Sequence, residues 1–289
     1  MILNQCKTIF LLALLSSLCM VLGYSIGGQH GMHIALIMAL IMNFVTYFFS
    51  DKIVLYAYKA EPLDKHHYSY VYSCVKDLSS RMGIPMPSLL LIPTDEANAF
   101  ATGRSPRHAS VAITKGITHI LNEHQLRGVL AHELAHIKNR DILISTIAAT
   151  LATAIGYVAH MAKYALLFGS SDSRRKNNNV IGAFFIAIFM PFAALLIQLG
   201  ISRSREYLAD ETGATYSQDP LSLASALETL HYHADTSRYS NDYQPYQTGT
   251  ASLFIVNPFR SGAITHLLST HPPVQERILR LRQMHKKMF

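Results

Sequence analysis

The segment His132-Glu133-Leu134-Ala135-His136 holds the residues of this chain that are best placed to do chemistry. On a helix, side chains four positions apart share one face, so His132 and His136 can bind a single zinc ion. Glu133 lies beside them and is placed to take a proton from a zinc-activated water molecule. The alternative interpretation is a pair of histidines packed on a helix face without a metal. The motif favours a hydrolytic zinc site with Glu133 as general base.

A catalytic zinc site needs a third protein ligand and one open position. The motif class that takes a third histidine shortly downstream requires a glycine and a histidine where this chain has Asn139 and Ile142. The chain also lacks the Asp-Gly pair that supplies an aspartate in intramembrane metalloproteases. A glutamate from a second helix remains, and Glu206 with Asp210 is the candidate pair. Glu206 would bind zinc, and Asp210 would accept a hydrogen bond from the ring N–H of a ligand histidine. The alternative is a solvated acidic pair beside Arg203 and Arg205.

The composition is typical of a membrane protein with a substantial polar part. Of 289 residues, 50% are hydrophobic and only 15% are charged, against about 25% charged in soluble domains. The net charge is +7 and the basic residues are spread along the chain without a nucleic-acid motif, so we expect contact with anionic lipid. The three cysteines form no Cys-x-x-Cys pair, which argues against a disulfide framework or a cysteine zinc site.

Four apolar stretches are long enough, or nearly so, to cross a bilayer, which takes about 20 residues. They run over residues 9–26, 32–49, 142–168 and 180–201. Eleven Lys or Arg residues lie in 51–141 and nine in 203–289, but none in the turn 27–31, which places both polar regions in the cytoplasm. The basic link 174–176 disagrees with this rule, because it would lie outside the cytoplasm if the third and fourth stretches both span the membrane. These two stretches therefore either span or form a hairpin that only partly enters the membrane. Their length favours spanning.

These boundaries predict four parts of the chain. They are a transmembrane hairpin (1–50), a first catalytic segment with the motif helix (51–141), a second transmembrane hairpin (142–201) and a second catalytic segment (202–289). The expected fold class is an α+β membrane protein, with a mainly helical catalytic domain, a small β-sheet and four transmembrane helices.

Within the polar regions, periodicity predicts helices over 67–82, 222–231 and 273–284 and strands over 88–93 and 109–114. A turn region with Gly103 and Pro106 separates the strands. The strand at 109–114 is either an exposed edge that pairs with an extended peptide or an internal strand.

The motif helix has a clear predicted start and no predicted stop. Asn122 and Gln125 form a capping-box pattern at its beginning. No Gly or Pro lies between the motif and Ile142, so we expect the helix to run on into the third apolar stretch.

The chain resembles the HtpX-type membrane zinc metalloproteases, which are related distantly to the zinc-dependent CAAX prenyl proteases. Five blocks in the family order carry the resemblance: Asn98–Gly103, His132–Asp141, Ser202–Asp210, Leu253–Pro258 and Thr270–Ile278. Together with the apolar stretches they cover nearly the whole chain. The Tyr- and Ser-rich loop 236–249 matches no motif of the family.

The resemblance implies a gluzincin-like catalytic domain on the cytoplasmic side of a bacterial inner membrane. It implies an endopeptidase that cleaves misfolded or damaged membrane proteins, with one zinc ion per chain bound by His132, His136 and Glu206. It places His271 and Arg277 near the substrate, with His271 as a donor to the carbonyl oxygen, and Asn98 in the active-site lining. The alternative for His271 and Arg277 is structural, as a helix N-terminus and a surface cation.

Two other functions stay open at this point. One is a prenyl-protein CAAX protease, although that relative has more membrane helices, which enclose a chamber. The other is a catalytically silent membrane scaffold with a structural zinc, a kind of site that four protein ligands close. Three candidate ligands and an intact Glu133 favour catalysis. The expected partners are polypeptide substrates and the lipid bilayer, and not nucleic acid.

Overall fold

The computed structural model describes residues 2–151, 203–236, 255 and 272–288. Most of the third apolar stretch, all of the fourth and the basic link between them lie outside the described residues. So do His271 and the loop that follows Thr236. The predictions made for these segments concern residues that the structure does not describe.

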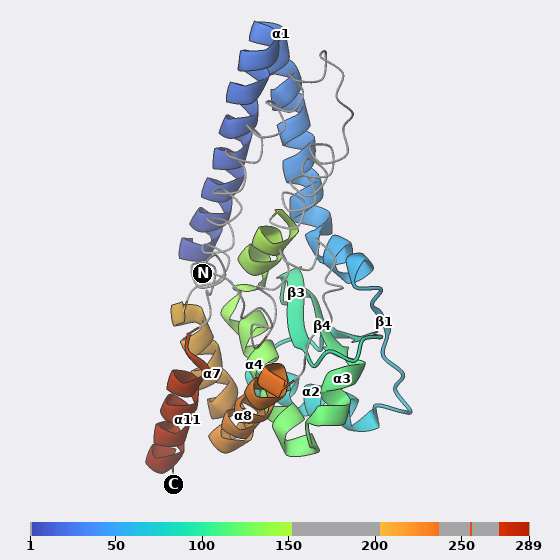
Figure 1. Cartoon of the computed structure of the whole chain (residues 1–289), viewed down its shortest axis with the longest axis vertical. Coiled ribbons are helices and arrows are strands. Elements are labelled where there is room, and N and C mark those ends of the chain that lie inside the picture. Colours follow the sequence, from blue (N-terminus) through green and yellow to red (C-terminus); the bar gives the residue numbers. More distant parts are fainter. Residues whose placement is uncertain (1, 152–202, 237–254, 256–271, 289) are drawn as a thin grey trace.

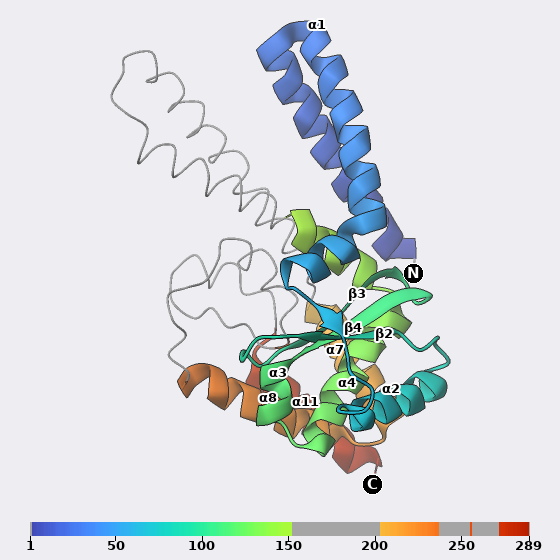
Figure 2. The ribbon, with the colours of Figure 1, turned by 90° about the vertical axis from the view of Figure 1, so that its right-hand side faces the viewer.

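The N-terminal helix α1 (Ile2–Ala57) is a hairpin of two helices joined at a kink (Figures 1 and 2). Gly28 makes the turn with φ 58° and ψ −143°, a backbone conformation that side chains with a Cβ rarely adopt. The Asn43 amide donates to Ser16 Oγ across the hairpin at 2.8 Å. Within the described part of the chain, Gly27–Ala57 is the one helix long and apolar enough to cross a membrane.

A four-stranded sheet lies below this hairpin in the order β1-β2-β4-β3 (Figure 2). The strands are β1 (Glu61–Pro62), β2 (Ser88–Ile92), β3 (Ala99–Ser105) and β4 (His108–Thr114). β4 pairs in parallel with β2 and antiparallel with β3, so it is internal. The edge interpretation of 109–114 is therefore wrong, and β3 is the edge strand on that side. β3 itself was missed, because its small residues show no clear alternation of polar and apolar side chains.

Besides α1 and the helix that begins at Ile142, the described residues contain six helices, and three of them lie where the periodicity of the sequence predicts a helix. The helix predicted over 67–82 is α2 (Ser69–Met82), which ends at Gly83 with φ 65°. The two helices predicted in the second polar region are α8 (Pro220–Thr236) and α11 (Val274–Met288). The remaining three are α3 (Lys115–Ile120), α4 (Glu123–Asn139) and α7 (Arg203–Ser217).

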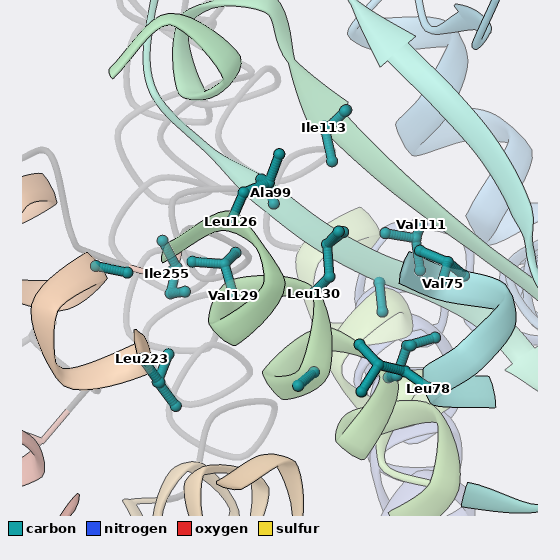
Figure 3. Close-up of a cluster of buried hydrophobic side chains, with 14 of the residues drawn as sticks. Val75, Leu78, Ala99, Val111, Ile113, Leu126, Val129, Leu130, Leu223 and Ile255 are labelled. Atoms are coloured by element: carbon teal, nitrogen blue, oxygen red, sulfur yellow. The ribbon is translucent and has the colours of Figure 1, made fainter. Parts of the chain in front are cut away.

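Helix α4, which carries the His-Glu-x-x-His motif, lies at the centre of the core (Figure 3). Its side chains Leu126, Val129 and Leu130 are buried between the sheet, α2 and α8. Full burial of each such side chain is worth about 1.5–3 kcal/mol, so the helix is held firmly. Its start is as predicted: Asn122 and Gln125 form both hydrogen bonds of a capping box.

The end of α4 differs from the prediction that it continues into the third apolar stretch. Arg140 takes the left-handed conformation with φ 57°, and its N–H bonds back to the last turn. A second helix then begins at Ile142 and is described as far as Leu151. The break leaves Asp141 outside both helices, with its side chain directed back at the motif.

Candidate metal centre

Three predicted ligands from two helices meet at one point. His132 and His136 come from α4 and Glu206 from α7, and one ligand atom of each lies within 4.8 Å of the others. The two Nε2 atoms are 3.1 Å apart, and each lies 3.7 Å from an oxygen of the Glu206 carboxylate. Two nitrogens bound tetrahedrally to one zinc would be about 3.4 Å apart. The donor set and its spacing therefore fit a single small metal ion.

Helix α7 can deliver Glu206 because it packs closely against the backbone of α4. A Cβ added at Gly213 would lie only 3.0 Å from backbone atoms of Ala131 and His132. Glu206 and Asp210 stand one turn apart on the buried face of α7. The same close contact therefore brings both carboxylates to the motif.

In each ligand histidine the Nδ1–H donates a hydrogen bond to a buried carboxylate. Asp210 Oδ1 lies 2.9 Å from His132 Nδ1, and both oxygens of Asp141 lie 3.1 Å from His136 Nδ1. When the ring is neutral and its hydrogen is on Nδ1, the Nε2 lone pair faces the ligand cluster. The sequence prediction named Asp210 for this task and missed Asp141. The available signal was a carboxylate five residues after His136, at the end of the family block.

Arg277 supports this arrangement from behind. Its guanidinium binds the Asp210 carboxylate through two hydrogen bonds, of 2.8 Å from Nε and 2.7 Å from Nη2. Nη1 donates to the Ile255 carbonyl at 3.2 Å. The side chain is 0% exposed, so the interpretation as a surface cation is wrong. Arg277 thus binds the Asp210 carboxylate, which in turn orients His132. The predicted contact between Arg277 and substrate stays a prediction.

The charges of this cluster stabilise the ionised forms of Asp210, His132 and His136, so the pKa of the carboxyl falls and the pKa values of the two histidines rise. Burial raises the pKa of the Asp210 carboxyl, but Arg277 outweighs it and holds that pKa below its usual value. Burial lowers the pKa of both histidines, and the carboxylates again outweigh it. Asp210 and Glu206 raise the pKa of His132, while Asp141 and then Glu206 raise the pKa of His136 to about 10.

Glu133 lies beside the ligands and is held by the edge strand. Its Oε2 accepts a hydrogen bond of 2.8 Å from the Ala101 N–H of β3. Burial raises the pKa of the Glu133 carboxyl, and the neighbouring His132 and His136 oppose that shift. A buried carboxylate with a raised pKa and one fixed oxygen is suited to accept and return a proton.

Asn98 is buried next to the site, with 1% of its surface exposed. Its side-chain oxygen accepts from the Ile255 N–H at 3.3 Å, so Asn98 and Arg277 together hold both polar groups of the Ile255 backbone. Its own N–H donates to Thr114 Oγ1 at 2.8 Å. These contacts position the chain around Ile255. A contact between Asn98 and substrate stays a prediction.

Two histidines on one helix, a carboxylate from another helix and an adjacent buried glutamate define a mononuclear metallohydrolase site. Residues 65–285 match the family model described as Peptidase family M48. The chain belongs to peptidase family M48 and is a metalloprotease.

The relatives are similar over nearly their whole length. The protein is 50% identical over 284 residues to a protease HtpX homolog of Syntrophobacter fumaroxidans, covering 97% of this chain and 99% of that protein. It is 47% identical over 285 residues to a homolog of Thermococcus sibiricus, covering 98% and 96% of the two chains. The resemblance to the HtpX-type proteases is thereby confirmed.

A solved structure shows the same fold at low identity. The crystal structure of S. mikatae Ste24p matches with a TM-score of 0.51 and 14% sequence identity. The match covers 97% of this chain and 66% of that chain, so this protein spans about two thirds of its length. Together with the apolar helix Gly27–Ala57 and the relatives, this likeness identifies a membrane protein with a mainly helical catalytic domain and a small mixed sheet.

Metal binding should strengthen as the pH rises. The pKa of His136 is raised to about 10 in the metal-free protein, so its imidazole is protonated at neutral pH. A metal binds only the neutral ring, so binding must release that proton, and affinity should rise about tenfold per pH unit for each proton released. Calorimetry of zinc binding in buffers of different ionisation enthalpy, at about pH 6 and about pH 8, measures both quantities. An affinity that does not change over this range contradicts the argument.

Proposed function

We propose that this metalloprotease is a zinc-dependent endopeptidase of a bacterial inner membrane that cleaves misfolded or damaged membrane proteins on the cytoplasmic side. The observation that carries the proposal is the convergence of His132, His136 and Glu206 beside Glu133. Two nitrogen donors and one carboxylate are the ligand set of a catalytic zinc, which keeps its fourth position open.

The residues of the site divide the work of peptide hydrolysis. When bound, zinc would polarise a water molecule and the scissile carbonyl. Glu133 takes the proton of the attacking water and returns it to the leaving amine, while the Ala101 N–H keeps its carboxylate in place. Asp210 and Asp141 fix the ring orientation of His132 and His136.

His271 remains our candidate donor to the carbonyl oxygen as negative charge develops there. Such a donor is typically worth about 3–4 kcal/mol in the transition state. The residue lies outside the described residues, and the assignment rests on the family block that runs from Thr270 to Ile278.

The edge strand β3 is the natural place for an extended substrate. The Ala101 N–H points away from β4 and reaches Glu133, so this edge runs beside the general base. A peptide added to the edge would be recognised mainly through its main chain, which suits the broad selectivity that damaged proteins require. We therefore assign the pairing with an extended peptide, first considered for residues 109–114, to the neighbouring strand β3.

The packing of the catalytic domain supports the proposed topology of two transmembrane hairpins, 1–50 and 142–201, with catalytic segments 51–141 and 202–289. Helices α4 and α7 belong to different segments yet share one buried contact through Gly213. The chain between them must therefore leave and return on the same side of the membrane. Two spans satisfy this condition, and the Lys and Arg residues of both catalytic segments favour the cytoplasm.

Purified protein in detergent should cleave unfolded casein, and loss of metal should stop it. We expect one zinc ion per chain, cleavage reduced to background by a zinc chelator, and recovery when zinc is restored. A prenylated CAAX peptide offered in parallel distinguishes the alternative function, which predicts cleavage of that peptide and not of casein. Casein cleavage that survives complete removal of the metal would refute the proposal.

A further inference from the structure

The turn between β3 and β4 reaches the foot of the α1 hairpin (Figures 1 and 2). The Arg104 guanidinium of β3 lies over the ring of Phe48 in α1, 5.2 Å from the ring centroid. Arg107 follows in the turn and is exposed. A basic end of the catalytic sheet thus lies against the helix that is long and apolar enough to span the membrane.

Phe48 lies at the level where this helix should leave the membrane. From the Gly28 turn to Phe48 the helix rises about 30 Å, the thickness of a hydrocarbon core. The rings of Phe44 and Tyr47 lie 4.7 Å and 4.9 Å from that of Phe48 and form an aromatic cluster with it. Aromatic rings followed by a cation are typical of a membrane interface, and the Lys52 ammonium lies 5.5 Å above the Phe49 ring.

The arginines at this level differ from exposed arginines elsewhere on the domain. Arg81, Arg280 and Arg282 each form an ion pair with a carboxylate. Among the residues that the structure describes, neither Arg104 nor Arg107 has a carboxylate partner. No carboxylate of the described residues neutralises their charge, and both arginines lie near the level expected for the lipid headgroups.

We propose that the β3–β4 turn binds the phosphate groups of anionic phospholipids through Arg104 and Arg107, with Lys52, one helical turn after Phe48 in α1, as a further cation at this level. A guanidinium binds phosphate through paired hydrogen bonds, and each basic side chain at an anionic surface strengthens binding about fivefold. The inference rests on the membrane placement proposed above, and it adds a lipid-binding site on the catalytic domain itself.

This contact would fix the substrate edge at the membrane surface. Ala101, which binds Glu133, is three residues before Arg104 on the same strand, a distance of about 10 Å. Lipid bound at Arg104 therefore holds the cleavage site within one short strand of the headgroups. Substrate segments that emerge from the bilayer reach the site without a long extended tether.

The chain contains no tryptophan, so one introduced tryptophan can report on this contact. Ser105→Trp places the reporter at the end of β3, directly before the turn. Leu279→Trp places a control on α11, at the opposite end of the domain (Figure 1). Each variant is reconstituted in nanodiscs with a small, equal fraction of brominated phosphatidylglycerol or brominated phosphatidylcholine. We expect quenching of Ser105→Trp by both lipids, about threefold or more stronger for the anionic one, and little quenching of Leu279→Trp.

Charge variants in the Ser105→Trp background test the assignment to the two arginines. Arg104→Gln with Arg107→Gln should abolish the preference for the anionic lipid while zinc content stays unchanged. Lys286→Gln with Lys287→Gln removes the same charge from the last turn of α11 and should keep the preference. Equal quenching by the two lipids, or a preference that survives the arginine replacements, overturns the lipid site. Absence of quenching by either lipid overturns the membrane placement as well, whereas failure of proteolysis appears only in the casein assay.

Discussion

Glu133→Gln should leave the zinc content unchanged and lower proteolysis by about 10²–10⁴-fold. Glutamine has nearly the same shape as glutamate, and its amide oxygen can still accept the Ala101 N–H. The ligands His132, His136 and Glu206 are untouched, so the metal should remain bound. The amide cannot take the proton of the attacking water, which removes the proposed general base. Zinc analysis and kcat on a fluorogenic peptide measure the two effects separately.

A suitable control is Glu211→Gln, which alters an exposed acid on α7 close to the site in sequence. It should retain both zinc and activity, because no part of the proposed mechanism uses Glu211. If purified Glu133→Gln protein cleaved peptide near the wild-type rate, Glu133 would not be the base. Loss of zinc in the same variant would make its role structural.

Glu206→Ala should abolish zinc binding and activity together. It removes the only ligand that α7 contributes to the described cluster and leaves two histidines from one helix. A catalytic zinc needs three protein ligands, so we expect substoichiometric metal and cleavage at background. Zinc titration with a competing chelator measures the affinity. Wild-type affinity in Glu206→Ala would show that the third ligand lies elsewhere, and His271 would then be the first residue to replace.

The carboxylates behind the histidines should give smaller, graded losses of metal. Asp210→Asn and Asp141→Asn each remove a charged acceptor from a ligand histidine, and changes of this kind cost about 10–100-fold in metal affinity. Arg277→Met would leave the Asp210 charge buried without its main partner. Breaking a buried ion pair costs about 3–5 kcal/mol, so this variant should also unfold more readily. Thermal denaturation beside zinc titration separates these contributions.

Much of the site follows from local patterns in the sequence. The spacing of His132 and His136 requires only a helix, and Asn122 with Gln125 marks where that helix starts. Glu206 and Asp210 share the same one-turn spacing on α7. Motifs of this kind depend on neighbours three or four residues away, so the sequence alone shows them.

The features that the sequence did not reveal depend on contacts between distant segments. β3 lacks an alternating pattern, and it is a strand because β4 pairs with it across the Pro106 turn. Helix α4 ends at Arg140 without a glycine that would have predicted the end, because Arg140 itself takes the left-handed conformation. This change of chain direction brings Asp141 within hydrogen-bond distance of His136. Arg277 resembles a surface cation in the sequence, and only the tertiary fold shows that Asp210 neutralises it in the core.

The metal centre is divided among three helices that are synthesised at different times. The ribosome completes α4, with both histidines and Glu133, before α7 supplies Glu206 and Asp210, and α11 adds Arg277 last. In the proposed topology, the apolar stretches 142–168 and 180–201 enter the membrane between the first two events. A nascent chain therefore carries an incomplete catalytic centre throughout insertion. In the proposed mechanism, the catalytic centre is therefore complete only after translation has passed α11, whose Arg277 binds Asp210.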